Sequence, residues 1–166
     1  MPIFSPLASA GFNTAPFVPP IDDYILKITR LSISAWEWND VTNLKITMAQ
    51  RIESDNVETN NKALNREFNF GTMDKETGEV LTCDMSKIAE VAHAAFGFEN
   101  RNASEDERFN ERFGADAFQF DTSEMRLIGN EWDQLIGCSY KASVKAVPGK
   151  NDRTNIYFND VRPVDA

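Results

Sequence analysis

The clearest pattern in the chain is the alternation of apolar and polar side chains near its end. From Cys138 to Ala146 every second residue is apolar or small, and Lys141 and Lys145 lie between them. Alternation of this kind is typical of a half-buried strand. The turn residues "PGKNDR" and a second alternating run, "TNIYFNDV", follow. The sequence therefore predicts a hairpin whose lysines lie on the outer face.

The first long run of β-branched and aromatic residues, "IDDYILKITRLSISAWEW", begins at Ile21. Its apolar residues change parity near Thr29 and Arg30, because Tyr24, Leu26 and Ile28 are at even positions whereas Leu31 and Ile33 are at odd ones. A β-bulge at that point would produce the change of parity and would bend the strand strongly.

Two more strands are predicted, at residues 44–52 and 63–73. The first has Leu44, Ile46 and Met48 on one side and Lys45 and Arg51 on the other. The second carries phenylalanines at alternate positions, which we expect to belong to the core.

Helical spacing replaces alternation in the middle of the chain. One helix is predicted with Asp84 as its cap and Gly97 just after its end. "NASEDERFNERFG" predicts a second, with a capping box that begins at Ser104. "EWDQLIG" predicts a further helical turn, capped by Asn130.

This order of elements predicts a mainly β protein with short helices. A strongly bent strand, two more strands, a helix and a closing hairpin are the order of an OB-fold, a five-stranded partly open barrel with a helix after strand 3. The predicted barrel spans residues 21–166, with a helical insertion near residues 100–136. The Pro-rich residues 1–20 are expected to form a flexible arm.

Composition limits the class of protein. The chain has 166 residues, a length that suits one domain, and a net charge of −9, which argues against a uniformly basic nucleic-acid binder. It does not exclude a local basic groove, since distant charges are screened. Two cysteines and one histidine are too few for a disulfide framework or an ordinary zinc site, so no metal and a reducing, cytoplasmic compartment are expected. We expect no signal peptide and no membrane span.

The outer face of the predicted barrel could bind an unpaired nucleic-acid strand. Cations would neutralise phosphates, and aromatic rings would stack on bases. The candidate cations are Lys45, Arg51, Lys141 and Lys145, and the candidate rings are Trp36, Trp38 and Tyr157. A structural explanation is about as good, because outward lysines also protect strand edges, outward rings can pack on the N-terminal arm, and a second bulge would turn both tryptophans into the core.

Three segments, "VPPIDDYILKITRLS", "KIAEVAHAAFG" and "LIGCSYKASVKAVPGKNDRTNIYFNDVRPV", resemble a family of small phage-encoded proteins. That family was long catalogued as a domain of unknown function and is similar to OB-fold single-stranded-DNA-binding proteins of phage replication and recombination. The residues of this chain that match the family's ending are Leu135, Gly137, Val144, Asn155, Val161 and Pro163. The resemblance implies a DNA-coating protein with little sequence preference, in the cytoplasm of the host cell.

Enzymatic activity is not expected. The chain has no glycine-rich phosphate loop, no G-x-S-x-G elbow and no H-E-x-x-H motif, and we expect no catalytic residues and no cofactor. The partners that remain open besides single-stranded DNA are replication or recombination proteins and a second copy of the chain. The alternative function is a non-catalytic structural or assembly protein of a virus, which would use the barrel and the arm for protein contacts.

Overall fold

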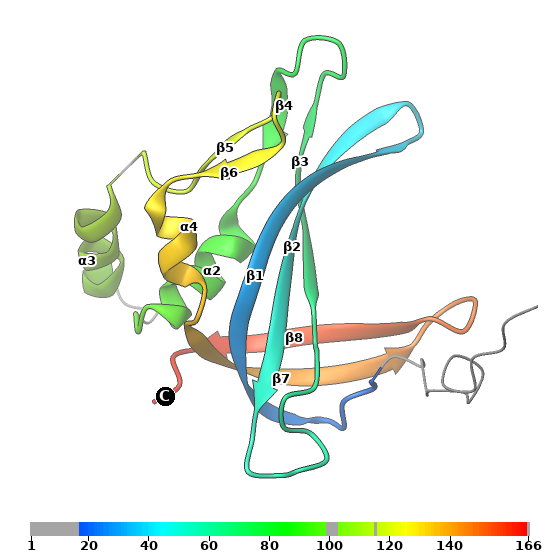
Figure 1. Cartoon of the computed structure of the whole chain (residues 1–166), viewed down its shortest axis with the longest axis vertical. Helices are drawn as coiled ribbons and strands as arrows, with labels where there is room; N and C mark the ends of the chain where they lie inside the picture. The colour runs from blue at the N-terminus through cyan, green and yellow to red at the C-terminus, as the bar shows by residue number, and fades with distance from the viewer. Residues whose placement is uncertain (1–16, 99–102, 115, 166) are drawn as a thin grey trace, which may run out of the picture.

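A curled antiparallel sheet, which Figure 1 shows as half of a barrel, dominates the fold. The computed structural model describes residues 17–98, 103–114 and 116–165. In spatial order the sheet is β4-β3-β2-β1-β7-β8. Its strands are β1 (Asp22–Trp38), β2 (Val41–Glu53), β3 (Arg66–Met73), β4 (Val80–Cys83), β7 (Ser139–Pro148) and β8 (Thr154–Arg162). The prediction of a mainly β protein with short helices is confirmed.

The predicted bulge in the first strand is confirmed. The pairing of β1 with β2 shifts register between Ile28 and Arg30. Before the shift Leu26 is buried and after it Ile33 is, so the strand keeps its apolar side inward across the change of parity. Only the part of β1 before the bulge pairs with β7, from Asp22 to Lys27, whereas β2 follows β1 to its end. The bent strand therefore joins the two halves of the sheet.

The described sheet has six strands where five were expected. The extra strand is β4, which pairs with the end of β3 from Gly71 to Met73. Its four residues are all exposed and do not alternate, so their pattern does not predict a half-buried strand. As a result the first helix follows β4 and not the third strand directly.

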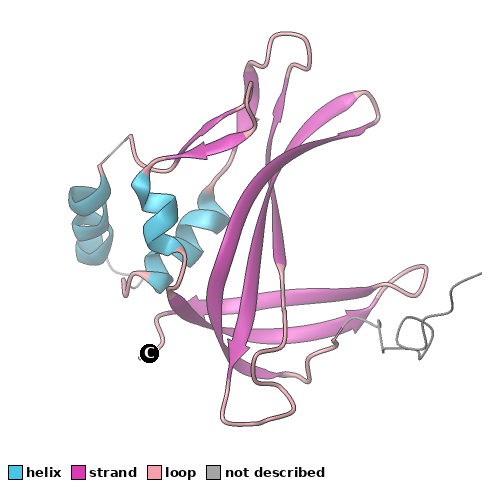
Figure 2. Ribbon diagram, viewed as in Figure 1, coloured by secondary structure: helices cyan, strands magenta, loops and turns pink. Residues whose placement is uncertain are grey.

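The helices lie together on one side of the sheet, as Figure 2 shows. They are α2 (Ser86–Ala95), α3 (Ala103–Phe113) and α4 (Asn130–Leu135). The cap position of α2 is held by Met85, one residue after the predicted Asp84, and no side chain caps the helix, although the Asp84 carboxylate accepts a hydrogen bond from the Ser86 N–H at 3.0 Å. Gly97 follows the end of the helix with φ of 88°, as predicted. The capping box predicted at Ser104 lies outside the described side chains.

The prediction that Asn130 caps α4 is wrong. Gly129 holds the cap position, and no side chain caps the helix. Gly129 has φ of 115°, a backbone conformation that glycine adopts readily and other residues avoid, so the chain turns one residue earlier than the sequence suggested.

The region between α3 and α4 contains a small hairpin that sequence analysis missed. It consists of β5 (Gln119–Asp121) and β6 (Arg126–Ile128). Phe118, next to it, packs edge-on against the buried Trp132 of α4, with ring centroids 5.0 Å apart. The expected N-terminal arm is described only from Phe17 onward, and the Phe17 side chain packs against the core.

Candidate nucleic-acid interface

All seven predicted site residues lie on the outer face of the main sheet. The alternate positions of the same strands are buried, among them Ile46 on β2 and Tyr140 on β7, which fixes the opposite side as outward. The only register shift between β1 and β2 is the one at Thr29, so the second bulge that would bury the tryptophans is not formed. Trp36 is 38% exposed and Trp38 is 65% exposed.

The predicted cations do not form one cluster. Lys45 and Arg51 lie on the same strand, six positions apart, which corresponds to about 20 Å along β2. Arg51 lies near β7 and its lysines, whereas Lys45 lies toward the β1–β2 hairpin. The interface therefore has two parts.

The first part is centred on Arg51 and includes two residues that sequence analysis missed. Lys27 lies directly opposite Arg51 on the neighbouring strand β1, and Arg30 follows the bulge on the same face. Lys141 on β7 lies opposite Ile25, one outward position along β1 from Lys27. We call Lys27, Arg30, Arg51 and Lys141 the basic group. Within the described residues none of its members forms an ion pair.

The carboxylates nearest the basic group are largely engaged with other side chains. Asp23 forms an ion pair with Arg162 at 2.9 Å and accepts a hydrogen bond from the Ser143 hydroxyl at 2.6 Å. The hydrogen bond from Ser143, followed by the attraction of Arg162, lowers the pKa of Asp23 below its ordinary value. Glu53 accepts a hydrogen bond from the Ser139 hydroxyl. Arg162 also pairs with Asp160 at 3.1 Å, and the charge of Lys141 contributes to the lowered pKa of Asp23. The four cations of the basic group outnumber the carboxylates Asp23 and Glu53 beside them, so this part of the interface keeps an excess of positive charge.

Lys145 and Tyr157 extend this part of the interface toward the β7–β8 turn. They are directly opposite each other in the register of β7 and β8, and the Tyr157 ring is 50% exposed. An exposed cation beside an exposed ring is the combination that binds a phosphate and stacks on the adjoining base.

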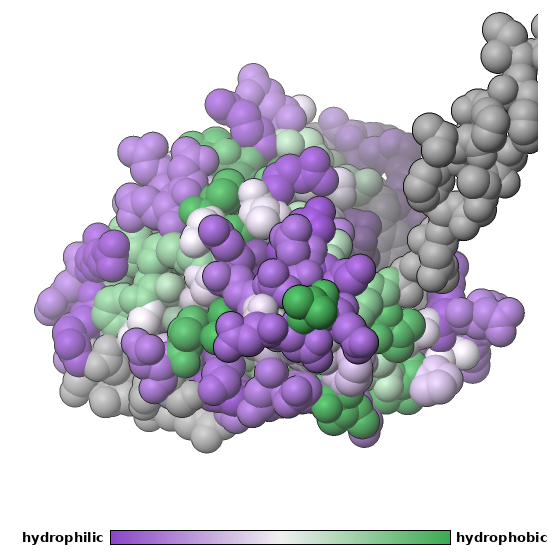
Figure 3. Space-filling view, turned by 60° about the horizontal axis from the view of Figure 1, so that its bottom comes forward, coloured by the Kyte–Doolittle hydropathy of each residue, from purple (hydrophilic) through white to green (hydrophobic). Residues whose placement is uncertain are grey.

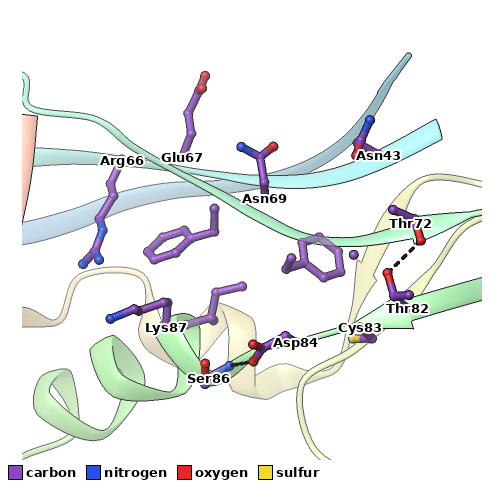
Figure 4. Close-up of a pocket in the computed structure, with 14 residues that line it drawn as sticks. Asn43, Arg66, Glu67, Asn69, Thr72, Thr82, Cys83, Asp84, Ser86 and Lys87 are labelled. Carbon is purple, nitrogen blue, oxygen red and sulfur yellow. Dashed lines mark hydrogen bonds between the residues drawn. The ribbon is translucent and has the colours of Figure 1, made fainter. Parts of the chain in front are cut away.

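The second part lies around Trp36. The Trp36 Nε1–H donates a hydrogen bond to Asn69 Oδ1 at 3.0 Å, so the indole reaches from β1 across β2 to β3. Lys45 forms an ion pair with Glu67 at 3.3 Å, and this carboxylate competes with any phosphate for the lysine. An open depression of about 660 Å³ follows the adjoining edge of β3. Figure 4 shows Glu67 and Asn69 on one side of β3 and Arg66 on the other, toward α2.

The signal that could have revealed Lys27 was present in the sequence. Lys27 alternates with Leu26 and Ile28, both predicted to be inward, so it had to face outward. Its pairing with Arg51 could not be foreseen, because the register between two strands depends on the turn that joins them.

Other kinds of site find no support in the described part of the chain. No three side chains of the types that bind metals lie together there, and none of its helices has the length and apolar character to cross a membrane. In comparisons with known proteins, the chain matches no family model and no curated protein.

Proposed function

We propose that the protein is a non-catalytic single-stranded-DNA-binding protein that coats DNA along the outer face of its sheet with little overall sequence preference. The observation that carries the proposal is the direct opposition of Lys27 and Arg51 in the register of β1 and β2. Like charges on opposite residues destabilise a sheet, by about 0.2–1 kcal/mol. In a chain with a net charge of −9, such a pair is best explained by an anionic ligand.

The basic group and the exposed rings together suit a single strand better than a duplex. The cations lie in a shallow band across three neighbouring strands, and the rings lie at the two ends of the interface, Trp36 near the β1–β2 hairpin and Tyr157 near the β7–β8 hairpin. Each base stacked on a ring is worth about 1–3 kcal/mol without selecting a sequence.

We further propose that the barrel is an OB-fold. The order β3-β2-β1-β7-β8 and the antiparallel pairing of β1 with β7 support this assignment, with β4 as an addition at the free edge. In an OB-fold the ligand lies over the second and third strands, between the first and the last hairpin loops. The corresponding loops here, at residues 39–40 and 149–153, flank the two parts of the interface.

The alternative function, a viral assembly protein, has less support from the face of the molecule shown in Figure 3. A stable protein–protein interface is expected to include a broad apolar patch. On the face shown in Figure 3, hydrophobic residues form small areas separated by hydrophilic ones.

The test is a titration of intrinsic tryptophan fluorescence with oligo(dT) at two salt concentrations. We expect quenching that weakens as salt is raised, with a slope of about −0.7 in log K against log salt for each phosphate neutralised. Lys141→Glu should weaken binding, whereas the matched control Arg126→Glu, at an exposed position of β6, should not. No quenching and no mobility shift with oligo(dT) would favour the assembly function.

A further inference from the structure

The polar side chains beside Trp36 form a small site that the phosphate-binding residues do not account for. Glu67 and Asn69 lie two positions apart on β3, so both face outward, about 7 Å apart along the strand. Both are exposed and belong to the residues that line the open depression along the edge of β3. Figure 4 shows both on the side of β3 that faces away from α2. The Trp36 indole extends from β1 across β2 and donates a hydrogen bond to Asn69.

The orientation of the Asn69 amide is fixed by its partner. An indole N–H can only donate, so the atom that it contacts at 3.0 Å must be the amide oxygen. The Asn69 Nδ2 group is left with its two hydrogens free, because it has no partner among the described residues. It is a hydrogen-bond donor at a defined position beside the ring.

Glu67 supplies acceptors next to this donor. Its Oε1 accepts from Lys45 at 3.3 Å, and its Oε2 has no partner in the described part of the chain. The ion pair with Lys45 restrains the carboxylate on the outer face of β3. The site therefore presents a free donor, a free anionic acceptor and an indole ring together on the outer face of the sheet.

These groups complement a nucleobase with an exocyclic amino group. The carboxylate accepts from the amino group, as Glu does from cytosine N4, while the Asn69 amide donates to the adjacent ring nitrogen or carbonyl. Thymine has no amino group, and its O4 carbonyl would meet the Glu67 carboxylate, two acceptors without a hydrogen between them.

We propose that Trp36, Glu67 and Asn69 form a base-reading position that favours bases with an amino group over thymine. The inference rests on the proposed function and adds to it that one nucleotide of the bound strand is selected by its edge, while the others are held by charge and stacking. Glu67 also restrains Lys45, so the same carboxylate lowers the affinity for phosphate and supplies the selectivity.

Oligo(dC) and oligo(dT) of equal length provide the test, because the two pyrimidines differ at the edge that Glu67 would contact. We expect the full chain to bind oligo(dC) with a Kd about fivefold or more below that for oligo(dT), the discrimination of one good base contact. Glu67→Gln should tighten binding to oligo(dT), since it frees Lys45, and should reduce the ratio of the two Kd values toward one. Asn69→Ala should reduce the ratio without raising the affinity for either.

Asn159→Ala, which removes another exposed amide from the outer face of β8, is the matched control and should leave the ratio unchanged. Circular dichroism identifies a variant that fails to fold, and the two substitutions test the site separately. Equal affinity of the unaltered chain for both oligonucleotides, or a preference that survives in both folded variants, overturns the base-reading position and leaves DNA binding intact. Absence of binding to either oligonucleotide overturns the proposed function as well.

Discussion

Replacement of Lys27 by Gln should stabilise the fold and weaken DNA binding at the same time. Lys27 and Arg51 are directly opposite in the sheet, so their Cβ atoms are about 5 Å apart, and Arg51 Nη1 donates a hydrogen bond to the Asn61 carbonyl at 2.8 Å. For two like charges about 7 Å apart in water the repulsion is about 0.6 kcal/mol, and screening at physiological salt reduces it to about 0.3 kcal/mol. Arg30 and Lys141 add further repulsion of the same sign.

The gain in stability should be measurable as a rise in the midpoint of thermal unfolding. For a domain of this length a change of 1 kcal/mol moves the midpoint by about 2–4 °C, so we expect a rise of about 1–2 °C at low salt and a smaller one at high salt. In the same variant the slope of log K against log salt for oligo(dT) should become shallower by about 0.7, since one phosphate contact is lost.

The control is Arg126→Gln, which makes the same change of charge on β6, outside both parts of the interface. It should leave the slope for oligo(dT) unchanged. If Lys27→Gln instead lowers the unfolding temperature, Lys27 stabilises the sheet and the argument from opposed charges is wrong. If the variant is more stable but binds with an unchanged slope, the repulsion is real and no phosphate lies against it.

Three further results are expected. Gly71→Ala should lower stability by about 1–3 kcal/mol in urea unfolding, because a Cβ at this position would collide with the backbone oxygen of Thr82 on β4. Tyr140→Phe should cost about 1–3 kcal/mol near neutral pH, since Gln50 Oε1 loses the hydroxyl that donates to it at 2.6 Å. Burial raises the pKa of Tyr140 from 10.0 to about 12. The unfolded chain therefore loses the Tyr140 proton at lower pH than the folded chain does, and the folded state should lose stability as the pH rises from about 10 to about 12. Tyr140→Phe should lose less stability over the same range, because phenylalanine has no hydroxyl to titrate. The slope of log K against log salt for oligo(dT) should be shallow near 10 mM salt, where the net negative charge of the protein still repels DNA at a distance. Near 150 mM the slope should steepen toward about −2.8, the value for four phosphates. A constant slope over this range would contradict a long-range repulsion that opposes the local attraction.

The faces of the long strands could be predicted from the sequence because burial imposes a period of two. The change of parity near Thr29 is visible in the letters alone, and the structure places the bulge there. The same rule identified Lys141 and Lys145 as outward. Phe68 and Phe70, expected in the core, are buried there.

The short strands could not be predicted, because they are too short to show a periodic pattern of apolar and polar residues. β4 is exposed along its whole length, and β5 and β6 are three residues each. Their formation depends on contacts distant in the sequence, such as the Thr122 hydroxyl, which donates to the Gly78 carbonyl at 2.6 Å. Local patterns carry no information about such partners.

The pairing of residues across neighbouring strands was the other feature that the sequence did not predict. Sequence analysis treated Lys45 and Arg51 as equivalent cations, yet one is paired with a carboxylate and the other is opposed by a lysine. Which residue lies opposite depends on the register, and a shift of one or two positions would exchange these neighbours. The distinction between a neutralised and an opposed cation, which decides what each can bind, therefore needed the structure.

The opposed cations and the acidic remainder of the chain fit together in one physical scheme. A net charge of −9 repels DNA from most of the surface, and at physiological salt this repulsion extends only about 8 Å. Within that distance a strand responds to the local charges, which at the basic group are positive and relieved of mutual repulsion when a phosphate lies between them. Under the proposed function, the repulsion that opposes folding of the free sheet would be relieved on binding, and only at the face where the cations meet. The surplus carboxylates elsewhere would weaken binding of DNA to every other surface, so the charge distribution would direct the strand to this face.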